Sequence, residues 1–192
     1  MNKPSFIVID FETANWLQIP CQVGIVTCEE GKITNRYETL ISLPKGVSID
    51  YKFTKIHKIR NQDLIGKPNF FELIPEIKSI LTKGYTVIAH NAKFDMMVLK
   101  KALKLHDIEP FDFNFACSVD VIRSWFPGKF PRHSLKVLAE ELGIKFLHHN
   151  ALADSEATCE VLLKCFDTQE QFENALTYKK KRYRSFYEYC QS

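Results

Sequence analysis

The 192-residue chain is 45% hydrophobic and 26% charged, which excludes disordered, collagen-like and coiled-coil proteins and predicts one domain with its own core. Its 26 basic and 23 acidic side chains leave a net charge of +3, an excess too small to establish a nucleic-acid partner. The apolar runs reach only strand length, and the first residues show no signal-peptide pattern. We therefore expect a cytoplasmic protein with no membrane partner.

The N-terminal half of the chain predicts mainly strands. Residues 5–10 (SFIVID) form an apolar, β-branched run that ends in an acid, as expected for a buried strand. Residues 21–28 and 32–42 alternate apolar with polar side chains on either side of a short Glu-Glu-Gly segment, which predicts an antiparallel hairpin. Residues 43–58 contain a proline and a glycine and show no sustained period, so we expect a loop there.

The following residues predict strand–helix units. Helical spacing of apolar residues predicts a helix over 69–81, and residues 85–89 (YTVIA) predict a strand that leads into a helix over 93–106. Residues 113–118 predict a fifth strand. Three further helical stretches are separated by proline and glycine, at residues 119–126, 134–142 and 153–166. A hairpin followed by such units predicts an α/β fold with a mixed sheet covered by helices.

Two acids end the first predicted strand. Asp10 and Glu12 are two residues apart, so the strand period directs both carboxylates to one face. Two carboxylates at that position can share a hard cation such as Mg²⁺, which would offset the negative charge at the edge of the core. A solvated strand end with salt bridges explains the pair equally well.

Two further acids follow a histidine at a junction between elements. The segment 90–95 (HNAKFD) joins a strand to a helix, and the segment 149–154 (HNALAD) precedes another helix. Junctions of this kind collect functional groups in α/β sheets. Asp95 and Asp154 each fall in a first helical turn, where helix capping alone could explain a carboxylate. His148 stands beside His149, so either histidine could be a surface residue.

Together these clusters resemble a known family. In order, DFE at 10–12, HNAKFD at 90–95 and HNALAD at 149–154 resemble the three motifs of the DEDD exonucleases. The histidine five residues before the last acid resembles the DEDDh branch, to which the epsilon proofreading subunit of bacterial DNA polymerase III and its stand-alone relatives belong. Secondary features also resemble this family: TKIH at 54–57, FP at 126–127 and HSLKVLA at 133–139.

The resemblance implies a ribonuclease-H-like fold with a mixed five-stranded sheet flanked by helices. It implies that Asp10, Glu12, Asp95 and Asp154 bind two divalent metal ions, Mg²⁺ or Mn²⁺, and that His149 is the general base. In the family's arrangement Asp10 bridges both ions, Glu12 and Asp154 complete one of them, and Asp95 acts mainly through water. Two such ions neutralise the phosphodiester and activate water, and an imidazole suits the proton transfer.

The resemblance also implies residues that hold the last nucleotides of the substrate. These are Phe94 and the backbone near Thr13, although Phe94 is equally explained as the apolar anchor of its helix. Many members of the family have Thr-Gly and an apolar wedge after the first acids, whereas this chain has Ala14-Asn15-Trp16. Trp16 is therefore a candidate for stacking on a base, with a place in the core as the alternative.

The function that the resemblance implies is a metal-dependent 3′-to-5′ exonuclease that releases nucleoside monophosphates from single-stranded DNA ends. An enzyme that trims RNA 3′ ends is the alternative within the same class, because recognition of the 2′-hydroxyl depends on geometry. A non-catalytic nucleic-acid-binding module tethered to a polymerase is the alternative from another class. The expected partners are single-stranded DNA or RNA 3′ ends, with a DNA polymerase as a possible protein partner.

The end of the chain differs from the rest in charge. Residues 178–187 (YKKKRYRSFY) hold five basic and four aromatic side chains and no acid. We therefore divide the chain into an exonuclease domain, residues 1–168, and a basic, aromatic C-terminal tail, residues 169–192. Basic residues interleaved with aromatic ones suit contact with a nucleic-acid strand. A helix packed on the domain is the alternative interpretation of this tail.

Overall fold

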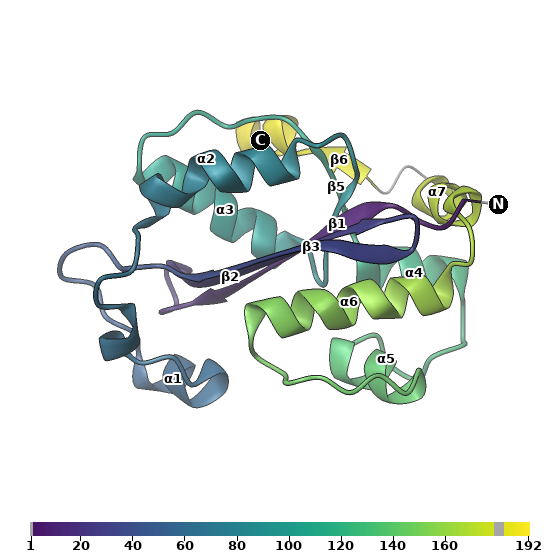
Figure 1. Cartoon of the computed structure of the whole chain (residues 1–192), viewed down its shortest axis with the longest axis horizontal. Helices are drawn as coiled ribbons and strands as arrows, with labels where there is room; N and C mark the ends of the chain where they lie inside the picture. The colour runs from purple at the N-terminus through teal and green to yellow at the C-terminus, as the bar shows by residue number, and fades with distance from the viewer. Residues whose placement is uncertain (1, 179–182) are drawn as a thin grey trace.

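The computed structural model describes residues 2–178 and 183–192. A six-stranded sheet in the order β3-β2-β1-β4-β5-β6 crosses the molecule, and helices cover both of its faces (Figure 1). The strands are β1 (Phe6–Thr13), β2 (Pro20–Glu29), β3 (Lys32–Leu40), β4 (Val87–Ala89), β5 (Asn114–Cys117) and β6 (Tyr183–Ser185). The helices are α1 (Tyr51–His57), the short 3-10 helix η1 (Asn61–Leu64), α2 (Phe70–Leu81), α3 (Lys93–Leu105), α4 (Ser118–Trp125), α5 (Leu135–Glu141), α6 (Ala151–Cys165), α7 (Gln169–Thr177) and α8 (Phe186–Gln191).

Strand β1 lies in the middle of the sheet and determines where the acids lie. It pairs antiparallel with β2, with Asp10 opposite Gly24 and Glu12 opposite Gln22. On its other side it pairs parallel with β4, which in turn pairs parallel with β5. The carboxyl ends of these three strands therefore share one edge of the sheet, where binding sites of α/β folds commonly form.

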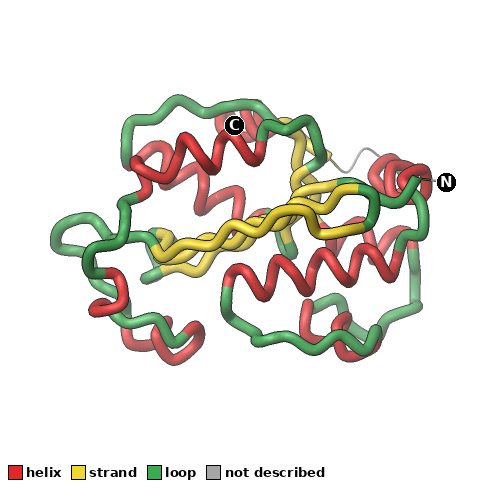
Figure 2. Tube along the Cα trace, viewed as in Figure 1, coloured by secondary structure: helices red, strands yellow, loops and turns green. Residues whose placement is uncertain are grey.

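Two apolar layers hold the helices against the sheet. On one face, Ile7 and Ile9 of β1 pack with α2 and α3, whereas on the other face Phe6 and Val8 pack with α4, α5 and α6. This alternation is the period of two that a strand covered on both faces requires. Figure 2 shows the helices on either side of the strands. The predicted α/β fold, with a mixed sheet flanked by helices, is confirmed.

The predicted loop over residues 43–58 is wrong in its second part. Helix α1 begins after Asp50 and occupies Tyr51–His57. The proline and glycine that suggested a loop both precede this helix. The helix has only seven residues, of which His57 is the buried one, so it lacks the repeated apolar positions by which a longer helix is recognised.

The number of strands is six instead of the expected five, because the end of the chain adds one. Strand β6 pairs antiparallel with β5. Before it, α7 brings Phe172 to 5.2 Å from the Phe6 ring, and after it the fully buried Phe186 stacks on Phe113 at 4.8 Å. Phe186 is therefore a core residue. The expectation that it contacts a nucleic-acid strand with the other aromatic residues of 178–187 is wrong.

Part of the predicted basic segment lies outside the described residues, namely Lys179, Lys180, Lys181 and Arg182. In the part that is described, Tyr178 packs edge-on against Trp125, with 5.2 Å between the ring centroids. Across the described residues, no helix combines the length and the apolar character that crossing a membrane requires.

Candidate active site

Three carboxylates meet at the carboxyl edge of β1. Asp10 and Glu12 come from β1 and Asp154 from the first turn of α6, and oxygens of all three lie within 4.8 Å of one another. The period of the strand explains why Asp10 and Glu12 share a side of the sheet. Residues 144 positions apart in sequence thus form one acidic cluster.

A glycine in the neighbouring strand allows α6 to approach this closely. A Cβ atom on Gly24 would lie 2.2 Å from the carbonyl carbon of Ala151, a separation that side chains do not adopt. The Ser155 hydroxyl donates to the Gly24 carbonyl at 3.0 Å. Because Gly24 is the partner of Asp10 across the β1–β2 ladder, the close contact brings the start of α6 directly beside Asp10.

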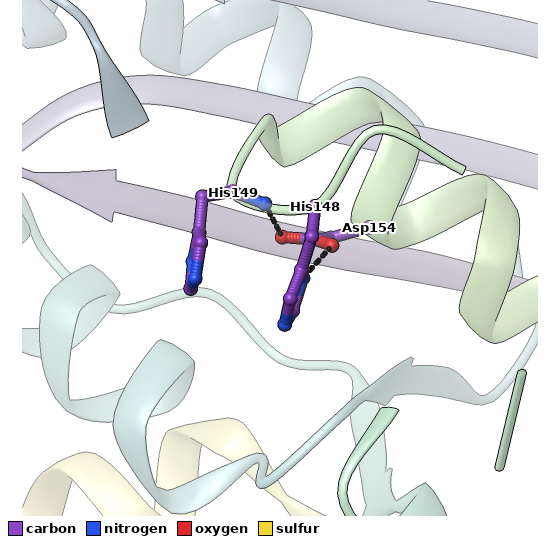
Figure 3. Close-up of side chains that lie close together, drawn as sticks. All are labelled: His148, His149 and Asp154. Atoms are coloured by element: carbon purple, nitrogen blue, oxygen red, sulfur yellow. Dashed lines mark hydrogen bonds and ion pairs between the residues drawn. The ribbon is translucent and has the colours of Figure 1, made fainter. Parts of the chain in front are cut away.

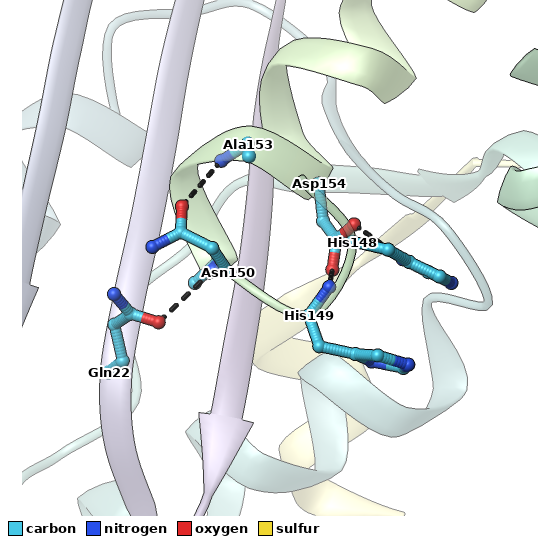
Figure 4. Close-up of polar contacts among 7 residues, drawn as sticks. Gln22, His148, His149, Asn150, Ala153 and Asp154 are labelled. Carbon is cyan, nitrogen blue, oxygen red and sulfur yellow. Dashed lines mark hydrogen bonds and ion pairs between the residues drawn. The ribbon is translucent and has the colours of Figure 1, made fainter. Parts of the chain in front are cut away.

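Side chains of the hairpin fix the first turn of α6. The Asn150 side chain caps the helix by accepting from Ala153 N at 2.9 Å, and the Gln22 side chain accepts from Ala151 N at 3.1 Å (Figure 4). Gln22 and Asn150 both donate to Glu38 Oε1, each at 2.8 Å. The loop that carries His149 is therefore tied to β2 and β3 through a continuous set of hydrogen bonds.

Asp95, in the first turn of α3, is outside this group of three but close enough for its charge to act on Asp10. Its side chain is 1% exposed and accepts a hydrogen bond from Phe11 N at 3.2 Å. The second carboxylate oxygen, Oδ2, is buried without a hydrogen-bond partner. A buried carboxylate oxygen in this state costs free energy unless a cation or a donor reaches it.

Burial and mutual repulsion raise the pKa values of these acids. The pKa of Asp10 is raised well above its usual value by burial and then by the charges of Asp95, Asp154 and Glu12. Burial, followed by the charge of Asp154, raises the pKa of Glu12 to about 8, and burial also raises that of Asp95. The cluster holds more negative charge than it can stabilise alone, and its oxygen donors suit a hard divalent cation.

Both histidines of the third motif contact Asp154. His148 Nδ1 lies 2.9 Å from Asp154 Oδ1, and His149 N donates to Asp154 Oδ2 at 3.1 Å (Figure 3). The two imidazole rings stack at 4.1 Å and lie nearly parallel. The pKa of His149 is lowered, first by burial and then by the charge of His148. A neutral His149 ring near neutral pH is able to accept a proton.

A cavity of about 450 Å³ opens beside the acids. Asp10 and Asp154 line it together with His90, His133 and His148. His90 is held by a 2.9 Å contact between its Nδ1 and the Ser118 hydroxyl, and burial lowers its pKa to about 4. The lining of the cavity therefore includes both acids and histidines.

The three predicted substrate residues lie in different environments. Thr13 is buried, and its carbonyl lies 3.2 Å from Nε2 of His57. Trp16 is 74% exposed and meets the Phe53 ring at 5.1 Å, so the alternative of a core position for Trp16 is wrong. Phe94 packs partly against the core and also lines an open hollow with Gln18 and Lys101.

Sequence reasoning assigned no role in the site to three residues that shape it. Gln22 supports the start of α6, His57 contacts the carbonyl of Thr13, and His148 contacts Asp154. A polar Gln within the apolar run of β2 was a signal for the first, because a buried amide needs partners. The sequence carried no signal for the contact between His148 and Asp154, because this contact depends on the backbone turn at His149.

A family model described as "Exonuclease" matches residues 7–162 of the chain. The chain belongs to this exonuclease family. The matched region contains all five residues of the acid and histidine set, and the predicted enzyme class and the resemblance to the DEDDh exonucleases are confirmed. Members of this family use divalent metal ions, in agreement with the donors in the cluster.

Curated relatives include DNA-processing proteins of several bacteria. The chain is 30% identical over 168 residues to a PolC-type DNA polymerase III of Thermotoga petrophila. This match covers 83% of this chain and 12% of that protein. The chain is 31% identical over 178 residues to the 3′-5′ exonuclease DinG of Bacillus subtilis, across 89% of this chain and 18% of DinG. The epsilon subunit of DNA polymerase III from Treponema pallidum is 28% identical over 148 residues, across 77% of this chain and 66% of the subunit. The chain thus spans less than a fifth of the first two relatives.

Solved structures share the fold. Exonuclease X bound to 5′ overhanging duplex DNA superposes with a TM-score of 0.70 at 24% identity, over 88% of this chain and 98% of that one. Exonuclease I of Escherichia coli bound to a dA16 oligonucleotide gives a TM-score of 0.73 at 18% identity, over 91% of this chain and 43% of that one. These likenesses confirm the expected ribonuclease-H-like fold.

Proposed function

We propose that this chain hydrolyses single-stranded DNA from its 3′ end and releases nucleoside monophosphates. The observation that carries the proposal is the convergence of Asp10, Glu12 and Asp154 within 4.8 Å, with the buried Asp95 near Asp10 and His149 beside Asp154. DNA is favoured over RNA because the relatives with 28% to 31% identity include DNA polymerase III proteins and a subunit of that enzyme.

In this proposal the four acids hold two divalent ions, Mg²⁺ or Mn²⁺. The raised pKa values of Asp10, Glu12 and Asp95 support this role, because carboxyl groups that repel one another release their protons when cations arrive. When bound, such ions neutralise the phosphodiester charge and lower the pKa of water. The unpartnered Oδ2 of Asp95 gives this residue an oxygen to offer, while its Oδ1 is held by Phe11 N.

His149 is the proposed general base. Its backbone is held to Asp154 by a 3.1 Å hydrogen bond, which keeps the ring beside the acids. Its lowered pKa keeps the imidazole neutral at the pH at which it must accept a proton from the attacking water. His148 is a positioning residue in this proposal, because its ring contacts Asp154 Oδ1 and stacks on His149.

The proposed grip on the last nucleotides uses Phe94, Trp16 and the backbone at Thr13. Trp16 is exposed and its ring contacts that of Phe53, so it can stack on a base without any change in the core. Phe94 reaches an open hollow from the first turn of α3, next to Asp95. The fixed carbonyl of Thr13 follows directly after Glu12, so a nucleotide held there would place its phosphate near the acids.

We also propose that residues 1–168 form the exonuclease domain, with residues 169–192 as a C-terminal addition to its sheet. The pairing of β6 with β5 and the burial of Phe186 support an addition that is integrated into the fold. A DNA polymerase is the proposed protein partner, because one relative is named as a subunit of DNA polymerase III.

The test uses DNA and RNA strands of one sequence, labelled at either the 3′ or the 5′ end, with Mg²⁺ or Mn²⁺. We expect the 3′ label to leave at once as a mononucleotide and the 5′-labelled strand to shorten stepwise, with DNA cut faster than RNA. EDTA should stop both reactions. Immediate release of the 5′ label, or full activity in EDTA, would refute the proposal, and faster cutting of RNA would reverse the substrate preference.

A further inference from the structure

Helix α1 and the turn after it form a basic surface beside the acids. Residues 51–62 contain no acid, and four basic side chains in this stretch are exposed: Lys52, Lys55, Lys58 and Arg60. In Figure 1, the end of α6 nearer to α1 is its start, and the first turn there carries Asp154. None of these four side chains belongs to the acid and histidine set described above.

Contacts at both ends tie α1 to the residues that follow Glu12. Before the helix, Asp50 N donates to the carbonyl of Ala14 at 2.8 Å. At its end, Nε2 of His57 lies 3.2 Å from the Thr13 carbonyl, and Nδ1 of His57 accepts from Ile59 N at 3.1 Å. His57 and Ile59 are both buried. Lys58 is therefore held between two anchored residues, close to the end of β1.

The backbone of Lys58 is in a conformation that favours glycine. Its φ of 66° and ψ of −2° place it in the left-handed region at the C-terminal cap of α1, a position that glycine commonly occupies. Two other non-glycine residues with positive φ, Asn91 and His149, lie at the acid cluster. A glycine at position 58 would relieve the strain of the left-handed backbone. The presence of a lysine there instead points to a use for its side chain.

The position of the charge agrees with such a use. Lys58 follows directly after His57, whose ring contacts the carbonyl of Thr13, the residue next to Glu12, so the backbone of Lys58 lies near the end of β1 that carries the acids. The ammonium now donates to the carbonyl of Lys55 at 2.6 Å on an exposed surface. A flexible lysine can exchange such a contact for a stronger one to an anion.

We propose that Lys58 binds a backbone phosphate in the 3′-terminal nucleotides of the substrate strand, and that the other basic residues of α1 continue this path away from the acids. This inference rests on the proposed function and adds a binding surface to it. In this proposal the nucleic-acid strand runs along α1, at the edge of the sheet where the acids lie.

The decisive variant is Lys58→Gly in the full chain. Because glycine relieves the left-handed backbone, the melting temperature should be equal to or higher than that of the unchanged protein. The KM for single-stranded DNA should rise about three- to fivefold at low salt, and more than kcat falls. The slope of log affinity against log salt should become shallower by about 0.7, the contribution of one phosphate contact on a single strand. Lys58→Arg should keep the original slope.

Two control variants separate strain and charge from binding. Asp107→Gly relieves another positive φ, of 55°, after the end of α3 and about 20 Å along that helix from Asp95. Lys83→Gln removes an exposed charge between α2 and β4. This position precedes the start of β4, whereas the acids lie at the edge where β4 ends. Neither change should alter the KM or the salt slope.

Binding is measured by fluorescence anisotropy of a labelled oligothymidylate in EDTA, so that it needs no turnover. An unchanged salt slope in Lys58→Gly would overturn the inference. A weaker strand affinity that accompanies a lower melting temperature would also overturn it, because the role would then be structural. Absence of cleavage by the unchanged protein would refute the proposed function instead, and the anisotropy measurement would still decide the role of Lys58.

Discussion

The apolar residues in the first half of β1 and the acids in its second half have opposite effects on stability. Phe6, Ile7, Val8 and Ile9 are fully buried and pack on both faces of the sheet, whereas Asp10 and Glu12 bring like charges together at its end. Burying the first four stabilises the fold by apolar contact. Crowding the acids destabilises the metal-free fold, because their charged forms are desolvated and repel one another. One strand thus carries both the core and the site, and sites commonly depart from the rules that hold in the core.

The largest effect should come from Asp10→Asn, which keeps the shape of the side chain and removes its charge. Turnover should fall to near zero with Mg²⁺ or Mn²⁺, because the cluster loses a ligand. The metal-free protein should at the same time melt at a higher temperature, since one of the repelling carboxylates is gone. Labelled-strand cleavage and thermal melting in EDTA measure the two effects.

The matched variant on the other half of β1 is Ile9→Ala, only one residue away. It should destabilise the protein by about 2 to 5 kcal/mol, the usual cost of truncating a buried isoleucine. A more stable Ile9→Ala, or a less stable metal-free Asp10→Asn, would contradict the division of the strand into a stabilising and a destabilising half.

The next effect concerns the two neighbouring histidines. His149→Ala should lower turnover by about 10² to 10⁴-fold, as expected on loss of a general base, with metal binding largely kept. The sequence left His148 open as a surface residue, but its 2.9 Å contact with Asp154 predicts a loss of about tenfold in His148→Ala, because the carboxylate would be misplaced. Single-turnover cleavage of a labelled strand compares them. A larger loss of turnover in His148→Ala than in His149→Ala would make His148 the general base and His149 the positioning residue.

A smaller effect should appear in the pH dependence of stability without metal. In the folded chain Glu12 holds its proton up to a pKa of about 8, whereas the unperturbed value is 4.5, and the pKa values of Asp10 and Asp95 are raised as well. The folded state therefore binds more protons than the unfolded state between these values, so stability should fall as the pH rises from about 4.5 to about 8.

Thermal melting in EDTA across this pH range measures the slope, and the same series with Mn²⁺ provides the comparison, because bound cations remove the cause of the raised pKa values. Asp10→Asn should flatten the slope in EDTA. Stability that rises with pH in EDTA would contradict the assignment of the destabilising charges to this cluster.

The four acids could be predicted from the sequence because each stands at the end of a regular element, where period and position are readable. The strand period at Asp10 and Glu12 and the first-turn positions of Asp95 and Asp154 all survive in the structure. The sheet and its main helices were readable for the same reason, since long runs repeat their pattern.

What could not be predicted depends on contacts between distant segments. Strand β6 has three residues, and only its pairing with β5 makes it a strand. Helix α1 is defined by contacts of its ends with Thr13 and Ala14 instead of by an apolar repeat. The close approach permitted by Gly24 also depends on a partner 127 residues away, at Ala151.

The central claim is that the acids at the end of β1 form a centre for two divalent ions, and metal binding tests it most directly. Isothermal titration calorimetry with Mn²⁺ on the unchanged protein and on Asp10→Asn, each first treated with EDTA and then freed of it, counts the ions. The account predicts two Mn²⁺ per chain for the unchanged protein, with the loss of at least one in Asp10→Asn. No binding to the unchanged protein, or equal binding to both proteins, would contradict it.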